Sequence, residues 1–126
     1  MFSLNIVDYL KCSHSLNGEI FGPAQIMHIS TFDIDVTFII PDVDENGIIV
    51  DFTAAQVALN ETLTPMRFKN LDDVEELAGI NTTTENLCKH VHDQISMKMK
   101  GLFHGSLRIT FHEGRGASAS YEAPMS

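Results

Sequence analysis

Apolar and polar residues alternate along the first 41 positions of the chain. Even positions are mostly apolar between residues 2 and 16, and mostly apolar again between residues 25 and 41, where aspartates and threonines take odd positions. A period of two indicates strands with one buried face. Asn-Gly and Gly-Pro pairs in the intervening segment are turn signals. We therefore predict two strands, at residues 2–16 and 25–41, joined by a loop.

The middle of the chain changes to helical spacing. Residues 53–56, T-A-A-Q, match a capping box in which Thr53 accepts a backbone N–H and Gln56 reaches back, so a helix is predicted from Thr53 to about residue 63. Residues 82–85, T-T-T-E, offer a second capping box before an apolar stripe at helical spacing. Two helices are therefore predicted in this region.

The last part of the chain returns to alternation, from residue 105 and again over residues 117–122. The predicted order is strand, strand, helix, helix, strand, strand. Pairing of strands that follow one another gives an α+β fold, with a four-stranded antiparallel sheet and two helices on one face. We expect residues 1–126 to form one domain.

Composition narrows the class of protein. The chain has 126 residues and is 44% hydrophobic, which suits one core. No apolar run approaches the ~20 residues of a membrane span, so no membrane association is expected. The first residues lack the features of a signal peptide, and the two cysteines form no CxxC pair. A reduced, cytoplasmic protein is expected.

The net charge of the chain limits the kinds of molecule that it is expected to bind. The formal net charge is −9, from 17 acidic and 8 basic residues. Such a field repels phosphate backbones, so no nucleic-acid binding is expected. An anionic substrate would have to meet a local cluster of lysine and arginine.

Three polar side chains occupy positions on the strand faces that are otherwise mostly apolar: His14, His28 and Glu113. If the first two strands pair, His14 and His28 lie at one end of the sheet on one face, where two imidazoles suit a metal. The alternative is that both are ordinary strand-end histidines. Glu113 is costly to bury unless it meets hydrogen-bond donors, and the alternative is that it turns into solvent.

Together with other segments, these residues resemble the 6-pyruvoyltetrahydropterin synthase and 6-carboxytetrahydropterin synthase family. In that family a strand histidine and an H-x-H pair hold zinc; His14 and His28 match the first two, and Ser30 replaces the third. Four further segments match the family in order: residues 47–52 (G-I-I-V-D-F), 69–72 (K-N-L-D), 82–86 (T-T-T-E-N) and 112–113 (H-E). The resemblance implies a tunnelling-fold subunit, zinc as cofactor, and Glu113 as the pterin anchor.

The chain departs from the family at the residues that transfer protons. The family's catalytic cysteine falls on Ala24, and its catalytic Asp-His pair falls on Arg67 and Phe68. Ala24 and Phe68 hold no exchangeable proton near neutral pH. Cys12, two residues before His14, is a possible substitute ligand or base, and the alternative is a buried core cysteine.

The resemblance leaves two main hypotheses for function. The first is a zinc-dependent lyase that acts on 7,8-dihydroneopterin triphosphate, with Arg67 and Lys69 as candidates for the triphosphate. The second is a pterin- or purine-binding protein that has lost the lyase chemistry. Thr83 and Thr84 are expected to contact the ligand from a neighbouring subunit, since the family forms homo-oligomers, commonly trimers or hexamers.

Overall fold

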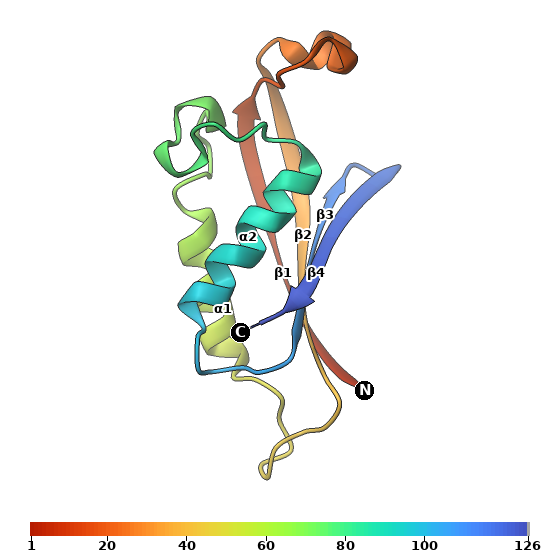
Figure 1. Cartoon of the computed structure of the whole chain (residues 1–126), viewed down its shortest axis with the longest axis vertical. Helices are drawn as coiled ribbons and strands as arrows, with labels where there is room; N and C mark the ends of the chain where they lie inside the picture. The colour runs from red at the N-terminus through yellow and green to blue at the C-terminus, as the bar shows by residue number, and fades with distance from the viewer. Residues whose placement is uncertain (126) are drawn as a thin grey trace.

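The computed structural model describes residues 1–125 and has the predicted order of main elements (Figure 1). The strands are β1 (Phe2–His14), β2 (His28–Ile40), β3 (Ser106–Glu113) and β4 (Ala117–Pro124), and the helices are α1 (Phe52–Leu63) and α2 (Thr84–Lys98). Short 3-10 segments occur at η1 (Glu19–Gln25), η2 (Leu71–Asp73) and η3 (Glu75–Leu77). The prediction of an α+β fold is confirmed.

The strands form one antiparallel sheet in the order β1-β2-β3-β4. Both helices cover the same face of this sheet (Figure 1). Alternate side chains of the strands point to that face and are buried with the apolar sides of the helices, as a period of two requires. The opposite face, which we call the open face, carries most of the polar strand residues.

The start of α1 differs from the prediction. Asp51, not Thr53, caps the helix: its carboxylate accepts hydrogen bonds from the backbone N–H groups of Thr53 (2.9 Å) and Ala54 (3.4 Å). A carboxylate at the N-cap satisfies free N–H groups and also interacts favourably with the helix dipole. The predicted capping box of Thr53 and Gln56 is therefore wrong.

The start of α2 is shifted by one residue. Thr83 is the N-cap, and its hydroxyl oxygen accepts from the backbone N–H of Asn86 at 3.2 Å. The predicted box began at Thr82, whose side chain instead contacts His14. Because Thr82 does not cap the helix, its side chain can take part in the site described below.

The second strand is shorter than the prediction, beginning at His28 rather than residue 25. The preceding residues form η1, which contains Pro23, and Leu16 donates its backbone N–H to the carbonyl of Ala24 at 2.9 Å. Within residues 1–125, neither helix combines the length and apolar character needed to cross a bilayer.

Candidate functional site

The two candidate metal-binding histidines lie side by side at one end of the sheet. His14 is the last residue of β1 and faces His28, the first residue of β2, directly across the pair of strands. Their ring centroids are 4.7 Å apart, and the ring planes differ by 52°. The expected juxtaposition is confirmed, whereas the role in metal binding stays a prediction.

His14 is buried and hydrogen-bonded through both ring nitrogens. Its Nδ1 lies 3.0 Å from Thr82 Oγ1, and its Nε2 lies 3.0 Å from Ser30 Oγ. Burial lowers the pKa of His14, and the neighbouring charge of His28 lowers it further, against weaker opposing effects that include the carboxylates of Asp72 and Glu113. The imidazole of His14 is therefore held in its neutral form near neutral pH.

His28 presents one nitrogen to the site. Its Nδ1 lies 2.9 Å from the carbonyl oxygen of Ile26. A carbonyl only accepts, so Nδ1 of His28 is the donor and Nε2 of the neutral ring keeps a free lone pair. Histidines that bind metals commonly have this arrangement, with the other nitrogen bonded to a backbone carbonyl.

The donor set for zinc is one ligand short of the three protein ligands of a catalytic site. His14 and His28 supply two imidazoles, but Ser30 supplies a hydroxyl that already bonds to His14. Within residues 1–125, no group of three or more His, Cys, Asp or Glu side chains is arranged to hold a metal ion. These residues therefore match the family's zinc site only in part.

Cys12 is a poor replacement for the missing ligand. It faces Ser30 across β1 and β2 and is 2% exposed. Burial raises the pKa of its thiol to about 11, whereas metals bind the thiolate. The alternative of a buried core cysteine is therefore the one that the geometry favours.

The second part of the site is a hollow of about 210 Å³ beside Glu113. Glu113 ends β3, and Thr84 Oγ1 donates to its Oε2 at 3.3 Å. Ala117 lies opposite Glu113 on β4. Ser118 and Ala119 complete the small side chains around the hollow. Glu113 is exposed and thus accessible to a ligand, with one protein donor already beside it.

Phe32 lies between the two parts of the site. It faces Glu113 across β2 and β3, and its ring meets the ring of His14 edge-on, with centroids 6.3 Å apart. The histidine pair and Glu113 therefore share the helix-covered face at one end of the sheet. Thr82 and Thr84 lie on either side of the α2 N-cap. Thr82 contacts His14, and Thr84 contacts Glu113.

The sequence predicted that Thr83 and Thr84 contact the ligand from a neighbouring subunit; it missed Thr82, and it missed that Thr84 lies beside Glu113 of its own subunit. Thr83 uses its hydroxyl oxygen to cap α2, while Thr84 reaches Glu113. Thr82 precedes the helix, so neither strand parity nor helical spacing indicates where its side chain points. The run of three threonines before a helix was the only signal in the sequence.

Ala24 and Phe68, which replace the family's proton-transfer residues, lie outside this group of side chains. Ala24 belongs to η1. Phe68 lies along the outer edge of β1, where its backbone N–H donates to the carbonyl of Lys11 at 2.7 Å. Within one subunit, neither residue joins the hollow beside Glu113.

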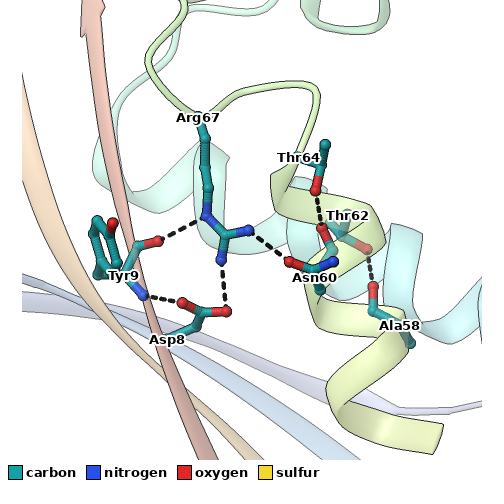
Figure 2. Close-up of polar contacts among 7 residues, drawn as sticks. All are labelled: Asp8, Tyr9, Ala58, Asn60, Thr62, Thr64 and Arg67. Atoms are coloured by element: carbon teal, nitrogen blue, oxygen red, sulfur yellow. Dashed lines mark hydrogen bonds and ion pairs between the residues drawn. The ribbon is translucent and has the colours of Figure 1, made fainter.

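Arg67 is engaged in contacts within the subunit, which Figure 2 shows. Its guanidinium bonds to Asp8 Oδ2 at 2.6 Å, to Asn60 Oδ1 at 2.8 Å and to the carbonyl of Tyr9 at 3.4 Å. These contacts join the loop after α1 to β1 and to α1 itself. Arg67 therefore has a structural role, which weakens its candidacy for the triphosphate.

We expect Arg67→Met to lower the free energy of unfolding by about 1–3 kcal/mol, because it leaves Asp8 without its charged partner in a partly buried position. Urea unfolding followed by circular dichroism measures the change. Arg108→Met is the matched control: Arg108 pairs with Glu122 at 2.7 Å, but both side chains are more than 40% exposed. The control is expected to cost less than about 1 kcal/mol. Equal losses in both variants would contradict the structural role of Arg67.

Comparison with known proteins matches the chain to the family model described as 6-pyruvoyl tetrahydropterin synthase, over residues 3–124. A search of curated protein sequences gives no match. The structure is similar to that of 6-pyruvoyl tetrahydropterin synthase from Caenorhabditis elegans, with a TM-score of 0.85, 20% identity, and coverage of 97% of this chain and 95% of that chain.

Two further structures have the same fold. 6-Pyruvoyl tetrahydropterin synthase from Plasmodium falciparum gives a TM-score of 0.76 at 12% identity, covering 97% of this chain and 98% of that chain. The enzyme from Plasmodium vivax gives 0.75 at 10% identity, covering 98% and 99%. The structural matches establish the fold, and the family model covers nearly the whole sequence. The chain therefore belongs to the 6-pyruvoyl tetrahydropterin synthase family.

Proposed function

We propose that this chain has a tetrahydropterin synthase-like function in which the binding of a pterin-like ligand is retained and the lyase chemistry is weak or absent. The observation that carries the proposal is Glu113, an accessible carboxylate beside Thr84 in a hollow on the helix-covered face. Family membership supports the class of ligand. The finer identity of the substrate, 7,8-dihydroneopterin triphosphate, is part of the proposal.

A carboxylate at this position suits the edge of a pterin. The 2-amino group and the ring N3–H present two parallel donors, which match the two oxygens of Glu113. Hydrogen bonds to a charged acceptor contribute ~1.5–3 kcal/mol each when they are desolvated. Thr84 is already bonded to Oε2, and it orients the carboxylate within the hollow.

The residues at the family's catalytic positions and around the histidine pair are poorly suited to move protons. The catalytic positions of the family hold Ala24 and Phe68, and neither carries an acid or base. The thiol of Cys12 has its pKa raised to about 11 by burial, far above working pH. His14 is neutral, but both of its nitrogens are bonded to hydroxyls, which compete with a substrate for its lone pair. We therefore expect slow or absent turnover of the pterin substrate.

The experiment that tests the proposal is a fluorescence titration with neopterin. Wild-type protein is expected to bind, and Glu113→Ala is expected to weaken binding at least about tenfold, or ~1.4 kcal/mol. Glu85→Ala is a matched control, since Glu85 also lines the hollow but contacts no group that the proposal uses. Guanosine offers a similar pair of donors, so tighter binding of guanosine would favour a purine ligand. No binding by the wild type, or no effect of Glu113→Ala, would refute the pocket assignment.

We also propose that the chain forms a homo-oligomer, such as a trimer or hexamer. An open sheet leaves edge strands with unpaired backbone groups that favour pairing with another copy. The edge of β1 is partly covered by residues 67–70, through bonds at Lys11 and Ser13, while β4 forms the other edge. Light scattering at micromolar concentration is expected to give a multiple of 14.0 kDa, and the monomer mass would contradict the proposal.

A further inference from the structure

His90 is a buried histidine on α2 that the proposed pterin site does not use. Its side chain is 8% exposed, and among residues 1–125 its Nε2 is the only buried side-chain nitrogen or oxygen without a hydrogen-bond partner. His92, on the same helix and 4% exposed, instead has its Nε2 3.0 Å from the carbonyl oxygen of Ala123. Buried polar groups are normally hydrogen-bonded, because an unpaired one loses its bonds to water without replacement. His90 is therefore costly to bury, even as a neutral ring.

His90 lies beside the segment that joins η2 to α2, which we call the η3 segment (residues 74–81). It lines a cavity of about 370 Å³ together with residues of this segment that include Ile80 and Asn81. Glu76, in η3 itself, is close enough for its charge to act on the imidazole. Because His90 also belongs to the buried side of α2, its ring lies between the helix and the η3 segment.

The η3 segment is held to the rest of the chain by few contacts. The backbone N–H groups of Leu77, Ala78 and Ile80 donate to carbonyls within the segment itself, at 3.0 Å each. Leu77 is the one buried residue of the segment. At its end, the side chain of Asn81 and the backbone of Asn17 share two hydrogen bonds, of 2.9 and 3.0 Å. Segments with few buried apolar contacts open more readily than the core, so we expect the η3 segment to open locally.

The charged groups around His90 do not offset its burial. Burial lowers the pKa of His90, and the carboxylates of Glu76 in η3 and Asp93 in α2 raise it by less. Lys89 lines the same cavity and is paired with Asp93 at 3.1 Å. Glu61 is the only charged residue of α1, and it is exposed. His90 is therefore neutral near neutral pH and becomes charged only under more acidic conditions.

We propose that protonation of His90 releases the η3 segment, which makes this segment an acid-sensitive part of the fold. A charged ring at this position leaves a buried N–H group without an acceptor, and opening of the segment brings that group into contact with water. Thr82 follows the segment directly, so its contact with His14 is loosened as well. The proposal rests on His90 and its surroundings, and it does not depend on the binding of a pterin.

The same proton makes the stability of the protein depend on pH. Histidine in an unfolded chain has a pKa of about 6.5, so below this value the unfolded chain binds a proton that the folded chain resists. With respect to His90, the protein is therefore fully stable at about pH 7.5 and loses stability as the pH falls through ~6.5. At about pH 5.5, this proton raises the equilibrium constant for unfolding by at most about tenfold, since one pH unit corresponds to one factor of ten. His14, whose pKa is also lowered by burial, adds a separate contribution.

Hydrogen–deuterium exchange followed by mass spectrometry tests the release. Peptides that cover residues 74–83 are compared at about pH 7.5 and about pH 5.5, after correction for the intrinsic pH dependence of amide exchange. In the wild type, the protection of these peptides is expected to fall at least about threefold at the lower pH. His90→Gln and His90→Leu carry no titratable group at this position, and each is expected to remove the fall. His104→Gln is the matched control, because His104 is exposed, and it should keep the pH dependence of the wild type.

An unchanged pH dependence in both His90 variants would overturn the proposal, as would equal protection of the wild-type segment at the two pH values. NMR titration of the His90 ring gives a second test on the wild type alone, where a pKa at or above ~6.5 would also overturn it. Urea unfolding should show a loss of stability at the lower pH that is smaller in the His90 variants than in the wild type. Binding of neopterin at about pH 7.5 is expected to be unchanged in His90→Gln, so this proposal and the pterin proposal fail in different experiments.

Discussion

The triple variant Ala24→Cys/Ser30→His/Phe68→His is expected to turn over 7,8-dihydroneopterin triphosphate at least ~100-fold faster than the wild type. The substitutions restore the thiol, the third zinc ligand and one imidazole that the family resemblance assigns to these positions. Positioned acids and bases contribute about 10²–10⁴-fold to a rate, which is the basis for this magnitude. Histidine is also better tolerated than phenylalanine at a positive φ, so position 68, at +57°, is expected to accept it.

The matched control for this experiment is Ala24→Ser/Ser30→His/Phe68→Leu. It makes similar changes of size at positions 24 and 68 but adds no group that titrates near neutral pH at either. We expect it to stay near the wild-type rate in a zinc-supplemented turnover assay. An equal gain in the control, or a wild-type rate in the ordinary enzyme range of about 1–10³ s⁻¹, would contradict the account of lost proton transfer.

The second large effect is expected in metal content. Wild-type protein should purify with substoichiometric zinc, because His14 and His28 provide two nitrogen ligands where a catalytic site has three. Ser30→His should raise the content to about one zinc per chain, since position 30 already contacts His14 Nε2. Elemental analysis by mass spectrometry, after dialysis against a weak chelator, measures the change.

His14→Ala and His28→Ala locate the metal. Each is expected to remove the residual zinc of the wild type, and each should also abolish the gain in the Ser30→His background. Ser30→Asn is the control for a change of size without a strong ligand. Full zinc occupancy that survives both histidine substitutions would show that the metal lies elsewhere.

The sheet and the position of the histidine pair were predictable from the sequence because both depend on strand parity. Parity places His14 and His28 on one face, and pairing of strands that follow one another in the chain makes them antiparallel neighbours. The same parity placed Glu113 on the face of Phe111 and separated it from His112, which bonds to Asp35 on the open face. Periodicity therefore fixed which face each of these strand residues occupies.

The details outside the strands were not predictable in this way. Asp51 and Thr53 are both suitable N-cap residues two positions apart, and the sequence allows either to cap the helix. The contact of Thr82 with His14 joins residues 68 positions apart through a loop, whose path no local pattern defines. Arg67 looked like a free cation, but its ion pair with Asp8 depends on how the loop after α1 returns to β1.

A crystal structure of the protein with neopterin tests the central proposal most directly. We predict that the 2-amino and N3–H groups of the pterin face the Glu113 carboxylate, at about 2.7–2.9 Å, and that Thr84 remains beside it. The side chain of the ligand should point towards His14 and His28. A pterin ring bound away from Glu113, or no pterin in the hollow at a saturating concentration, would contradict the proposal.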